Sequence, residues 1–520
     1  MTEATSQPSP PPQGGREKRS QARPKLTVTG SGLTPELVAE VTRGRRPVAL
    51  APEALERMAQ ARAVVERAFA ENRAVYGLTT GLGARVGHRL TPEDAAEFSR
   101  QTILGRANAV GPRLPAEAVR ALMVVRANQM ALGGSGAQPA IAELLVAMLN
   151  AQVHPEVPSI GSIGAADLCQ MAHLGLAMIG EGKAEHGGAV LPAREALARS
   201  GLAPATLGPK DGLAICNSNA ATAGRAALAL VDAAEILRLA QIAAALTFEG
   251  FRANLSPFDP RVQAARPAPG QQEAAEQLLA LLEGSLLMEP GAARRLQDPL
   301  SLRCVSQVHG ALIAALQFAR DALDPEINGA GDNPLVIAED DAILSTGNFH
   351  TTALALALDT LAIALAQVGA LSAARAQRLL SDKLTELPAN LIAGDGANSG
   401  FAPLAKTGQA LMAEIRLLAQ PASIDPRMGA EGVEDDSSNA PLAVRKLADI
   451  LERVRPLLAI EMIEAAQAID LRRPETMGKA AERTYALVRS LVQPLESDRP
   501  LGEEVERVAA ALSHLREPDA

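Results

Sequence analysis

Residues 157–173 read VPSIGSIGAADLCQMAH, and this stretch carries the strongest information about the fold. It contains Gly161 and Gly164, and the second of these glycines is followed directly by Ala165, Ala166 and Asp167. Taken alone, such a glycine- and alanine-rich segment is typical of a turn that leads into a helix. Three further motifs elsewhere in the chain give the segment a more specific meaning.

A tyrosine stands in the first of these motifs. The chain has two tyrosines, and Tyr76 lies in the sequence VYGLTTGLG at residues 75–83. Closely spaced glycines predict a tight loop with exposed backbone that presents the phenol. Such a phenol can act as a general base, or it can simply order its loop through one hydrogen bond.

The other two motifs contain an arginine and an asparagine. Residues 297–304 read QDPLSLRC, and the planar, permanently charged guanidinium of Arg303 is suited to pairing with a carboxylate. An arginine at a helix start can equally be a surface or capping residue. Residues 210–219 read KDGLAICNSN, in which Asn217 is either a binding residue or the N-cap of the helix that follows.

Together, the four motifs resemble the signatures of the histidine and phenylalanine ammonia-lyase family, in which they follow one another in the same order along the chain as here. That family reads V-P-x-x-G-S-x-G-A-S-G-D-L, V-Y-G-V-N-T-G-F-G, Q-D-P-Y-S-L-R-C and K-E-G-L-A-L-I-N-G-T. The resemblance runs from about Leu26 to Leu471. It implies a mainly α fold, a histidine ammonia-lyase-like bundle of long helices with a mixed N-terminal region and small β-hairpins. It also implies a homotetramer in which three subunits build each active site.

The resemblance assigns roles to individual residues. It makes Tyr76 the base that removes the β-proton of the substrate, Arg303 the partner of the substrate carboxylate, and Asn217 and Gln297 polar residues of the same site. Leu300 stands where the family has a second catalytic tyrosine, and Arg106 stands where it has a histidine that contacts the substrate side chain. The remaining substrate-binding positions implied by the family are Asn348, Phe349 and Glu434.

In the cofactor loop the sequence departs from the family. There the internal Ala-Ser-Gly cyclises into a methylidene-imidazolone, an electrophile made from the backbone. This chain has Gly164, Ala165, Ala166 and Asp167, one residue fewer, without the serine and the glycine. We therefore expect no methylidene-imidazolone and no other cofactor. The expected activity is β-proton abstraction and elimination, or isomerisation, on an amino acid or related small carboxylate without that group. The alternative is an inactive member that binds a small carboxylate or assembles with an intact paralogue.

Arg106 leaves two interpretations open. A fixed positive charge in the pocket would suit a substrate with an acidic side group better than one with an imidazole or phenyl ring. Alternatively, Arg106 forms a structural ion pair with Glu434 or Asp436.

Composition narrows the functional classes. Hydrophobic residues make up 47% of the chain but aromatic residues only 2%, so Ala, Leu, Ile and Val on closely approaching helices must fill the interior. Few aromatic side chains and a net charge of −9 disfavour nucleic-acid binding. Cys169, Cys216 and Cys304 are too far apart for a disulfide framework or a paired-ligand metal site, and we expect buried, reduced thiols and no metal.

The chain divides into four predicted regions. Residues 1–25 form a polar, basic, disordered tail, residues 26–215 a mixed region, residues 216–480 the helical bundle, and residues 481–520 a C-terminal helical segment. Apolar periodicity predicts long helices over 217–249, 301–324, 351–381 and 443–471, the last with a kink at Pro456. A hairpin is expected over 334–345. The absence of a signal-like or membrane-spanning pattern predicts a cytoplasmic protein.

Overall fold

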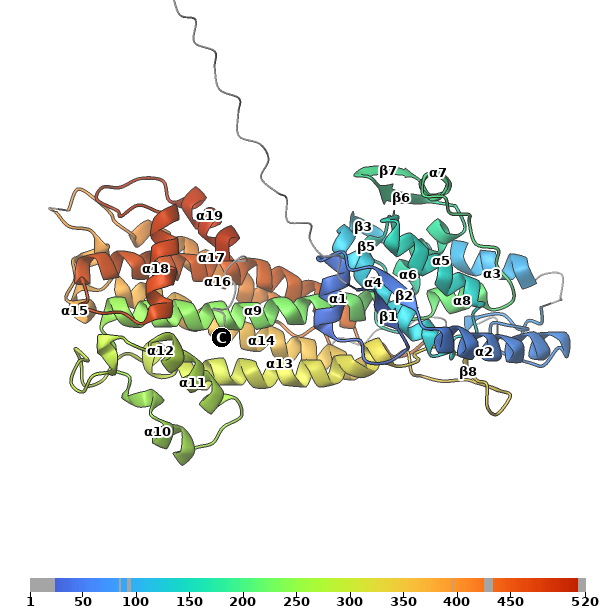
Figure 1. The fold of residues 1–520 in the computed structure, drawn as a ribbon, viewed down its shortest axis with the longest axis horizontal. Helices are drawn as coiled ribbons and strands as arrows, with labels where there is room; N and C mark the ends of the chain where they lie inside the picture. Colours follow the sequence, from blue (N-terminus) through green and yellow to red (C-terminus); the bar gives the residue numbers. More distant parts are fainter. Residues whose placement is uncertain (1–23, 84–85, 91–94, 395, 425–433, 513–520) are drawn as a thin grey trace, which may run out of the picture.

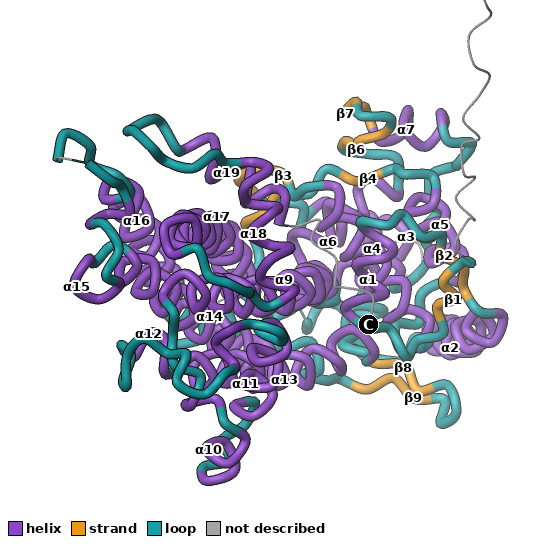
Figure 2. The backbone as a smooth tube through the Cα atoms, turned by 60° about the vertical axis from the view of Figure 1, so that its left-hand side comes forward, coloured by secondary structure: helices purple, strands orange, loops and turns teal. Residues whose placement is uncertain are grey.

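The computed structural model describes residues 24–83, 86–90, 95–394, 396–424 and 434–512. The predicted disordered tail, residues 1–25, lies almost entirely outside this part of the chain. Helices dominate the molecule, and the strands form small sheets at one end of it (Figure 2).

Four long helices form the body of the protein and run along its long axis (Figure 1). They are α9 (Ala220–Phe251), α13 (Val305–Asn328), α14 (Thr352–Leu379) and α17 (Ala440–Arg472). All four predicted long helices are therefore confirmed. The second differs at its start, because a short helix α12 (Leu300–Arg303) is separated from α13 at Cys304.

The mixed N-terminal region caps one end of the bundle (Figure 1). Its helices are α1 (Pro35–Thr42), α2 (Pro52–Ala70), α3 (Ala95–Leu104), α4 (Ala116–Ala131), α5 (Pro139–Asn150), α6 (Leu168–Met178), α7 (Ala193–Arg199) and α8 (Asp211–Cys216). Its strands are β1 (Leu26–Val28), β2 (Val48–Leu50), β3 (Val110–Arg113), β4 (His154–Pro155), β5 (Pro158–Ile160), β6 (Lys183–His186) and β7 (Ala189–Pro192). Strand β1 pairs in parallel with β2, β3 is antiparallel to β5, and β4, β6 and β7 form an antiparallel sheet.

Shorter helices surround the other end of the bundle. They are α10 (Pro260–Ala265), α11 (Gln271–Leu281), α15 (Asp382–Thr385), α16 (Ala402–Leu418), α18 (Lys479–Leu491) and α19 (Gly502–Leu512), with 3-10 turns at Ser256–Phe258, Leu286–Met288 and Ala389–Leu391. The predicted hairpin is confirmed as β8 (Leu335–Ile337) and β9 (Ala342–Leu344). It packs against α2 rather than within the bundle.

Small residues allow the helices to approach one another closely. A Cβ atom at Gly224 of α9 would lie 2.7 Å from the backbone carbon of Ala121 on α4. One at Gly250, near the other end of α9, would lie 2.9 Å from the Cβ of Ala468 on α17. Contacts this short leave no room for a side chain, so glycine and alanine set the spacing between these helices. The prediction that small and aliphatic residues on closely approaching helices fill the interior is therefore confirmed, although a few phenylalanines are also buried, and the rings of Phe248 and Phe258 lie 5.5 Å apart.

A buried ion pair joins the central helices. Glu461 on α17 and Arg375 on α14 are both fully buried, and Arg375 donates from Nε at 2.6 Å and from Nη2 at 2.9 Å. Thr247 on α9 donates to the same carboxylate at 2.7 Å. One turn later, the carboxylate of Glu464 is equally buried, but neither of its oxygens accepts a hydrogen bond from any residue in the described part of the chain. Burial raises the pKa of Glu464 well above its ordinary value, with Glu461 adding to the shift.

Two of the long helices have unusual sequence features, a proline inside α17 and the strongly apolar composition of α14. Pro456 lies inside α17, and the helix continues past it to Arg472, as predicted. Helix α14 is long and apolar enough, by length and composition alone, to cross a membrane. Leu354, Leu358 and Leu365 are completely buried within the chain, which is also what a core helix of a bundle requires.

Candidate functional site

The loop at residues 164–167 is held by three separate segments. The Oγ of Ser438 donates to the carbonyl of Gly164 at 3.1 Å, and the amide of Asn439 donates to the carbonyl of Ile163 at 2.8 Å. Ala165 forms an isolated β-bridge with His350. Gly164 has φ +93°, and a Cβ there would lie 2.0 Å from the Ser438 hydroxyl. This position therefore requires glycine.

Asp167 connects the loop to the start of α9. Its carboxylate accepts from the amide of Thr222 at 2.7 Å and from the Thr222 hydroxyl at 2.8 Å. Its own amide donates to the carbonyl of Ser218 at 2.7 Å. Burial raises the pKa of Asp167 to about 6, although the Thr222 hydrogen bonds oppose this shift. Asp167 thus satisfies an N-terminal amide of α9 and fixes the end of the loop.

The tyrosine loop packs against α8. The phenol oxygen of Tyr76 accepts a hydrogen bond of 3.0 Å from the amide of Gly83. Gly77 has φ +65°, and a Cβ at this residue would lie 2.6 Å from the side chain of Leu213 on α8. The predicted glycine-dependent loop is therefore present. An N–H donor at the phenol oxygen is the arrangement that stabilises negative charge there.

Asn217 lies directly after α8, and the residue that follows it, Ser218, accepts from the amide of Asp167 at 2.7 Å. Nδ2 of Asn217 donates to the carbonyl of Asn333 at 2.6 Å, and the Asn217 side chain is 7% exposed. The predicted alternative, that Asn217 caps α9, is wrong, because Ser218 provides the capping oxygen to the amide of Ala220 at 3.1 Å. Asn217 is instead the C-cap of α8.

Arg106 lies near the start of α6, and among the described residues no carboxylate forms an ion pair with it. Its Nη1 donates to the carbonyl of Thr102 at 3.3 Å, and its charge acts on the thiols of Cys169 and Cys216. Burial nevertheless raises the pKa of Cys216 to about 12, so this thiol is protonated. All three cysteines are free, as predicted, although only Cys216 is fully buried.

The proposed ion pair between Arg106 and Glu434 or Asp436 is not found among the residues that the structure describes. Asp436 instead approaches Nε2 of His350 at 3.6 Å. His350 follows Asn348 and Phe349, two predicted substrate-binding residues. Because His350 bridges to Ala165, this segment lies at the cofactor loop, as the resemblance implies. Glu434 is exposed.

Arg303 and Gln297 lie at the opposite end of the bundle (Figure 1). Arg303 donates from Nε to the carbonyl of Asp298 at 2.7 Å. With its amide oxygen turned toward the guanidinium, Gln297 accepts from Nη1 of Arg303 at 2.8 Å. Leu300, at the position of the family's second tyrosine, is 63% exposed.

The length of α9 gives the separation between the cofactor loop and the pair formed by Arg303 and Gln297. Asp167 contacts Thr222 in the first turn of α9, and Asp298 accepts from the amide of Asn254 just beyond its last turn, at 2.6 Å. The 32 residues of α9 span about 48 Å at 1.5 Å per residue. Within one chain, the Tyr76 loop, Asn217 and the cofactor loop therefore belong to the N-terminal region at one end of the bundle, whereas Arg303 and Gln297 lie at the other end.

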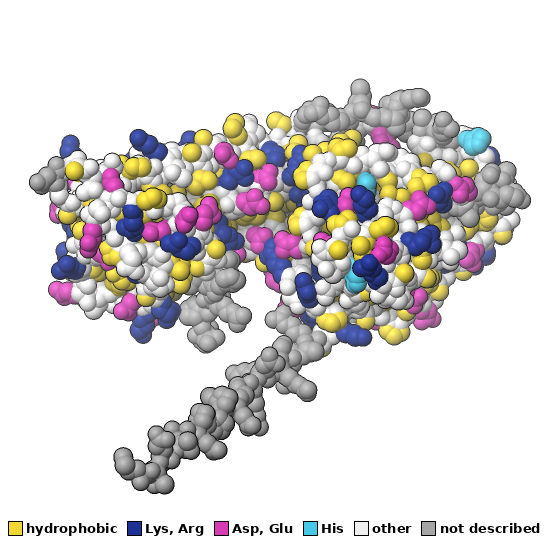
Figure 3. Space-filling view, turned by 90° about the horizontal axis from the view of Figure 1, so that it is seen from above, with side chains coloured by type: hydrophobic (Ala, Val, Ile, Leu, Met, Phe, Trp, Pro, Cys, Tyr) yellow, Lys and Arg dark blue, Asp and Glu magenta, His cyan; other side chains and the backbone are white. Residues whose placement is uncertain are grey.

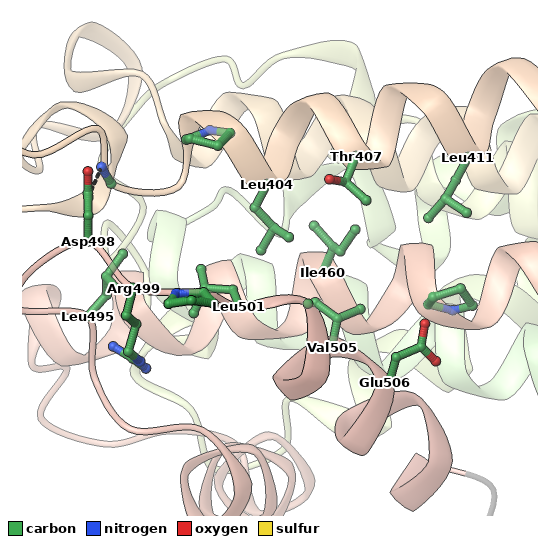
Figure 4. A pocket seen from close by; sticks show the side chains of 15 residues that line it. Leu404, Thr407, Leu411, Ile460, Leu495, Asp498, Arg499, Leu501, Val505 and Glu506 are labelled. Atoms are coloured by element: carbon green, nitrogen blue, oxygen red, sulfur yellow. Dashed lines mark hydrogen bonds between the residues drawn. The ribbon is translucent and has the colours of Figure 1, made fainter.

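One cavity lies in a different part of the bundle from these residues. A cavity of about 540 Å³ lies between α16, α17 and α19, with Leu404, Ile460 and Val505 inside and Asp498 at its edge (Figure 4). None of the predicted site residues lines it. Lys and Arg side chains alternate with Asp and Glu on the face shown in Figure 3. Across the described ranges, no group of three or more His, Cys, Asp or Glu side chains could hold a metal ion.

Several residues around the site were missed by the sequence analysis. Ser438 and Thr222 hold the cofactor loop, and Glu326 receives a hydrogen bond from Asn219 close to the start of α9. Burial raises the pKa of Glu326 to about 7. Serine and threonine are too common to indicate a site, but a glutamate near the end of an apolar helix is a signal that could have been followed.

Comparison with known proteins identifies the class. Residues 33–490 match the aromatic amino acid lyase family. The chain is 42% identical to a histidine ammonia-lyase of Symbiobacterium thermophilum, covering 92% of this chain and 95% of the relative. It is 41% identical to that of Stigmatella aurantiaca, covering 94% and 97%.

A solved structure is similar throughout its length. The ergothioneine-degrading enzyme ergothionase of Treponema denticola, in complex with desmethyl-ergothioneine sulfonic acid, superimposes with a TM-score of 0.91 at 32% identity. The match covers 94% of this chain and 99% of that one. The chain therefore belongs to the aromatic amino acid lyase family, and its mainly helical fold is the ammonia-lyase fold.

These comparisons contradict two predictions made from the cofactor loop. We expected no methylidene-imidazolone, and an activity that does without it. Several relatives at about 40% identity over more than nine-tenths of the chain are named histidine ammonia-lyase, the activity with which that cofactor is associated. Four residues of one loop carry less information about the activity than similarity over the whole chain. Because Ala165 and Ala166 carry no hydroxyl group, these residues do not fit the family's Ala-Ser-Gly triad, and we derive no catalytic step through the group.

Proposed function

We propose that this protein is a carbon–nitrogen lyase that eliminates the amine from an α-amino acid with an imidazole-type side chain. The observation that carries the proposal is the 42% identity, over 92% of this chain, to a histidine ammonia-lyase. The Tyr76 loop, Asn217 and the 164–167 loop all belong to the N-terminal region at one end of the bundle, which supports it. The phenol oxygen of Tyr76 already faces an N–H donor, as a catalytic base would need.

In the proposed reaction, Tyr76 removes a proton from the substrate's Cβ. The electrons of that C–H bond form a double bond between Cα and Cβ, and the Cα–N bond of the substrate's ammonium group breaks, with its electron pair leaving on nitrogen. The products are an α,β-unsaturated acid and neutral ammonia, and the abstracted proton remains on the phenol of Tyr76 until it is released to solvent. The base alone contributes about 10²- to 10⁴-fold to the rate, so the surrounding groups must stabilise the departing amine.

We further propose that Arg303 and Gln297 reach this site from another copy of the chain. Arg303 presents a guanidinium suited to the substrate carboxylate, but within its own chain it lies about 48 Å from the loop, by the length of α9. One face of α14 supports self-association, because Leu356, Thr360, Ile363 and Gln367 are exposed at helical spacing and none of them is charged. The homotetramer implied by the family resemblance would bury this face.

A first experiment tests the base. L-Histidine is incubated with the purified protein, and vinyl proton signals of an unsaturated acid are followed by NMR together with amine release. The Tyr76→Phe variant is expected to lose at least 10²-fold in kcat. Tyr485→Phe is the matched control, because the second tyrosine hydrogen-bonds Asp470 far from the loop. Equal turnover by Tyr76→Phe and wild type would refute the assignment.

A second experiment tests the shared site. Tyr76→Phe and Arg303→Gln are each expected to be inactive, and co-expression of the two should restore part of the activity, because some sites then receive Tyr76 from one chain and Arg303 from another. A monomer in sedimentation analysis, or co-expressed variants as inactive as each alone, would contradict a site built from several chains.

A second candidate substrate is ergothioneine. The structurally similar ergothionase of Treponema denticola degrades that compound, and its solved structure contains desmethyl-ergothioneine sulfonic acid, which is an anion. Arg106 supports this candidate, since no carboxylate in the described part of this chain forms an ion pair with its guanidinium. Assaying L-histidine and ergothioneine side by side decides between them. Arg106→His should then raise the ratio of histidine to ergothioneine turnover, and an unchanged ratio would exclude a role of Arg106 in selection.

A further inference from the structure

Asn217 is oriented by a fully buried ion pair that does not itself touch the candidate site. Arg126, in the middle of α4, is completely buried and donates to both oxygens of Asp332, from Nη2 at 2.7 Å and from Nη1 at 3.3 Å. The same Nη2 donates to the carbonyl of Ala214 in α8. A single guanidinium therefore binds both α8, which ends just before Asn217, and Asp332, which precedes Asn333.

These contacts close a ring. From Arg126, one path runs through Ala214 and α8 to Asn217, and the other runs through Asp332 to Asn333. The two paths meet where Nδ2 of Asn217 donates to the carbonyl of Asn333 at 2.6 Å. Fixing both partners of a hydrogen bond from a common anchor leaves little freedom for the bond itself.

The ring also determines which way the Asn217 amide faces. A carbonyl oxygen can only accept, so the nitrogen of the carboxamide must face Asn333 and the oxygen must point away. Among the described residues, Oδ1 of Asn217 accepts no hydrogen bond, and it is not one of the fully buried polar atoms that lack a partner. An acceptor is thus left open beside the cofactor loop, where the N–H groups of a substrate amine could reach it.

We propose that the Arg126–Asp332 pair is a positioning unit that holds the Asn217 carboxamide with Oδ1 toward the amine of the substrate. Arg126 and Asp332 are positioning residues, because they act through Asn217 and contact no substrate. This inference rests on the proposed function, which places Asn217 in the site. It goes beyond that function because it states which way Oδ1 of Asn217 points and attributes that orientation to the buried pair of Arg126 and Asp332.

The test is a double-mutant cycle. Asp332→Asn keeps the size of the side chain but removes its charge, and Asn217→Ala removes the oriented amide. Each single variant is expected to lower kcat by about 10²-fold, the usual cost of misplacing a catalytic contact by about 1 Å. In the Asn217→Ala background, adding Asp332→Asn should change kcat by no more than about 2-fold, because the group it positions is already absent. Two losses that multiply would overturn the proposal.

Arg120→Lys provides the matched control. Arg120 is also buried on α4 and binds the carbonyls of Leu149 and Val41, but it has no contact with α8. Arg126→Lys and Arg120→Lys should lower stability similarly, while only Arg126→Lys lowers kcat. If Arg120→Lys reduces kcat as much, the effect is general loss of packing and the proposal fails.

A crystal structure of Asp332→Asn tests the inference without activity. The proposal expects the Asn217 amide to be rotated or to occupy several orientations, and an amide unchanged in position would overturn it. Absence of turnover in the wild-type protein would contradict the proposed lyase function, whereas this structural result bears on the positioning unit alone.

Discussion

Replacing Arg375 with methionine is expected to destabilise the bundle by about 3–5 kcal/mol, because it leaves a buried carboxylate without its counter-ion. Glu461 is fully buried and accepts four hydrogen bonds, of which Arg375 supplies two. The others come from Thr247 at 2.7 Å and Ser372 at 2.6 Å. Two hydroxyl groups cannot neutralise the charge.

The expected size follows from the burial of the pair. Removing one partner of a buried ion pair leaves the other charge out of water without a counter-ion, whereas replacing both partners by apolar side chains leaves no buried charge.

Urea denaturation followed by far-ultraviolet circular dichroism, at one fixed protein concentration, measures these changes. The double variant Arg375→Met/Glu461→Leu should recover most of the stability, since neither charge remains buried. Glu464→Met is the matched control on the same helix. Glu464 has no hydrogen-bond partner and a raised pKa, so its replacement should leave stability unchanged or increase it. A loss below about 1 kcal/mol for Arg375→Met, or a double variant as unstable as the single one, would refute the reasoning.

Two other predictions concern the start of α9. Burial raises the pKa of Glu326 to about 7, so its contribution to stability is present in full below its unfolded pKa of about 4.5 and is lost as the pH rises to about 7. Glu326→Gln should therefore reduce the decline in unfolding free energy over that pH interval by about 2–3 kcal/mol. An unchanged pH dependence of the unfolding free energy would argue against a raised pKa. Gly224→Val should destabilise the protein by about 1–3 kcal/mol, because even a Cβ at this position would lie 2.7 Å from the backbone of α4. Gly32→Ala should cost less despite the positive φ of Gly32, because a Cβ there meets nothing within 4 Å. Equal losses of stability for the two variants in thermal or urea denaturation would contradict the close packing of α9 on α4.

Much of the fold could be predicted from local pattern. The long helices were predicted from apolar residues at steps of three and four, and the structure places their ends within a few residues of the prediction. The hairpin at β8 and β9 and the glycine loop that presents Tyr76 were predicted in the same way. Side chains that follow a helix or strand period report which face is buried, so these features are written along the chain.

The candidate site was predicted less completely. The motifs indicated which residues carry chemistry, but the cofactor expectation drawn from Ala165 and Ala166 is wrong, and the pairing of Arg106 with Asp436 is not found among the described residues. The family resemblance implied a site shared between subunits, but the motifs themselves do not record that Tyr76 and Arg303 lie at opposite ends of one bundle. Their separation depends on the direction and length of α9, which no motif records.

The sequence by itself determined the helices, the loops and the chemically useful side chains, because each depends on residues within a few positions of one another. Only the tertiary structure decided which of these side chains meet. Arg126 and Asp332 are 206 residues apart in the sequence and 2.7 Å apart in the folded chain. Buried charges find their partners wherever packing brings opposite charge out of water, and that pairing is a property of the whole fold rather than of any segment.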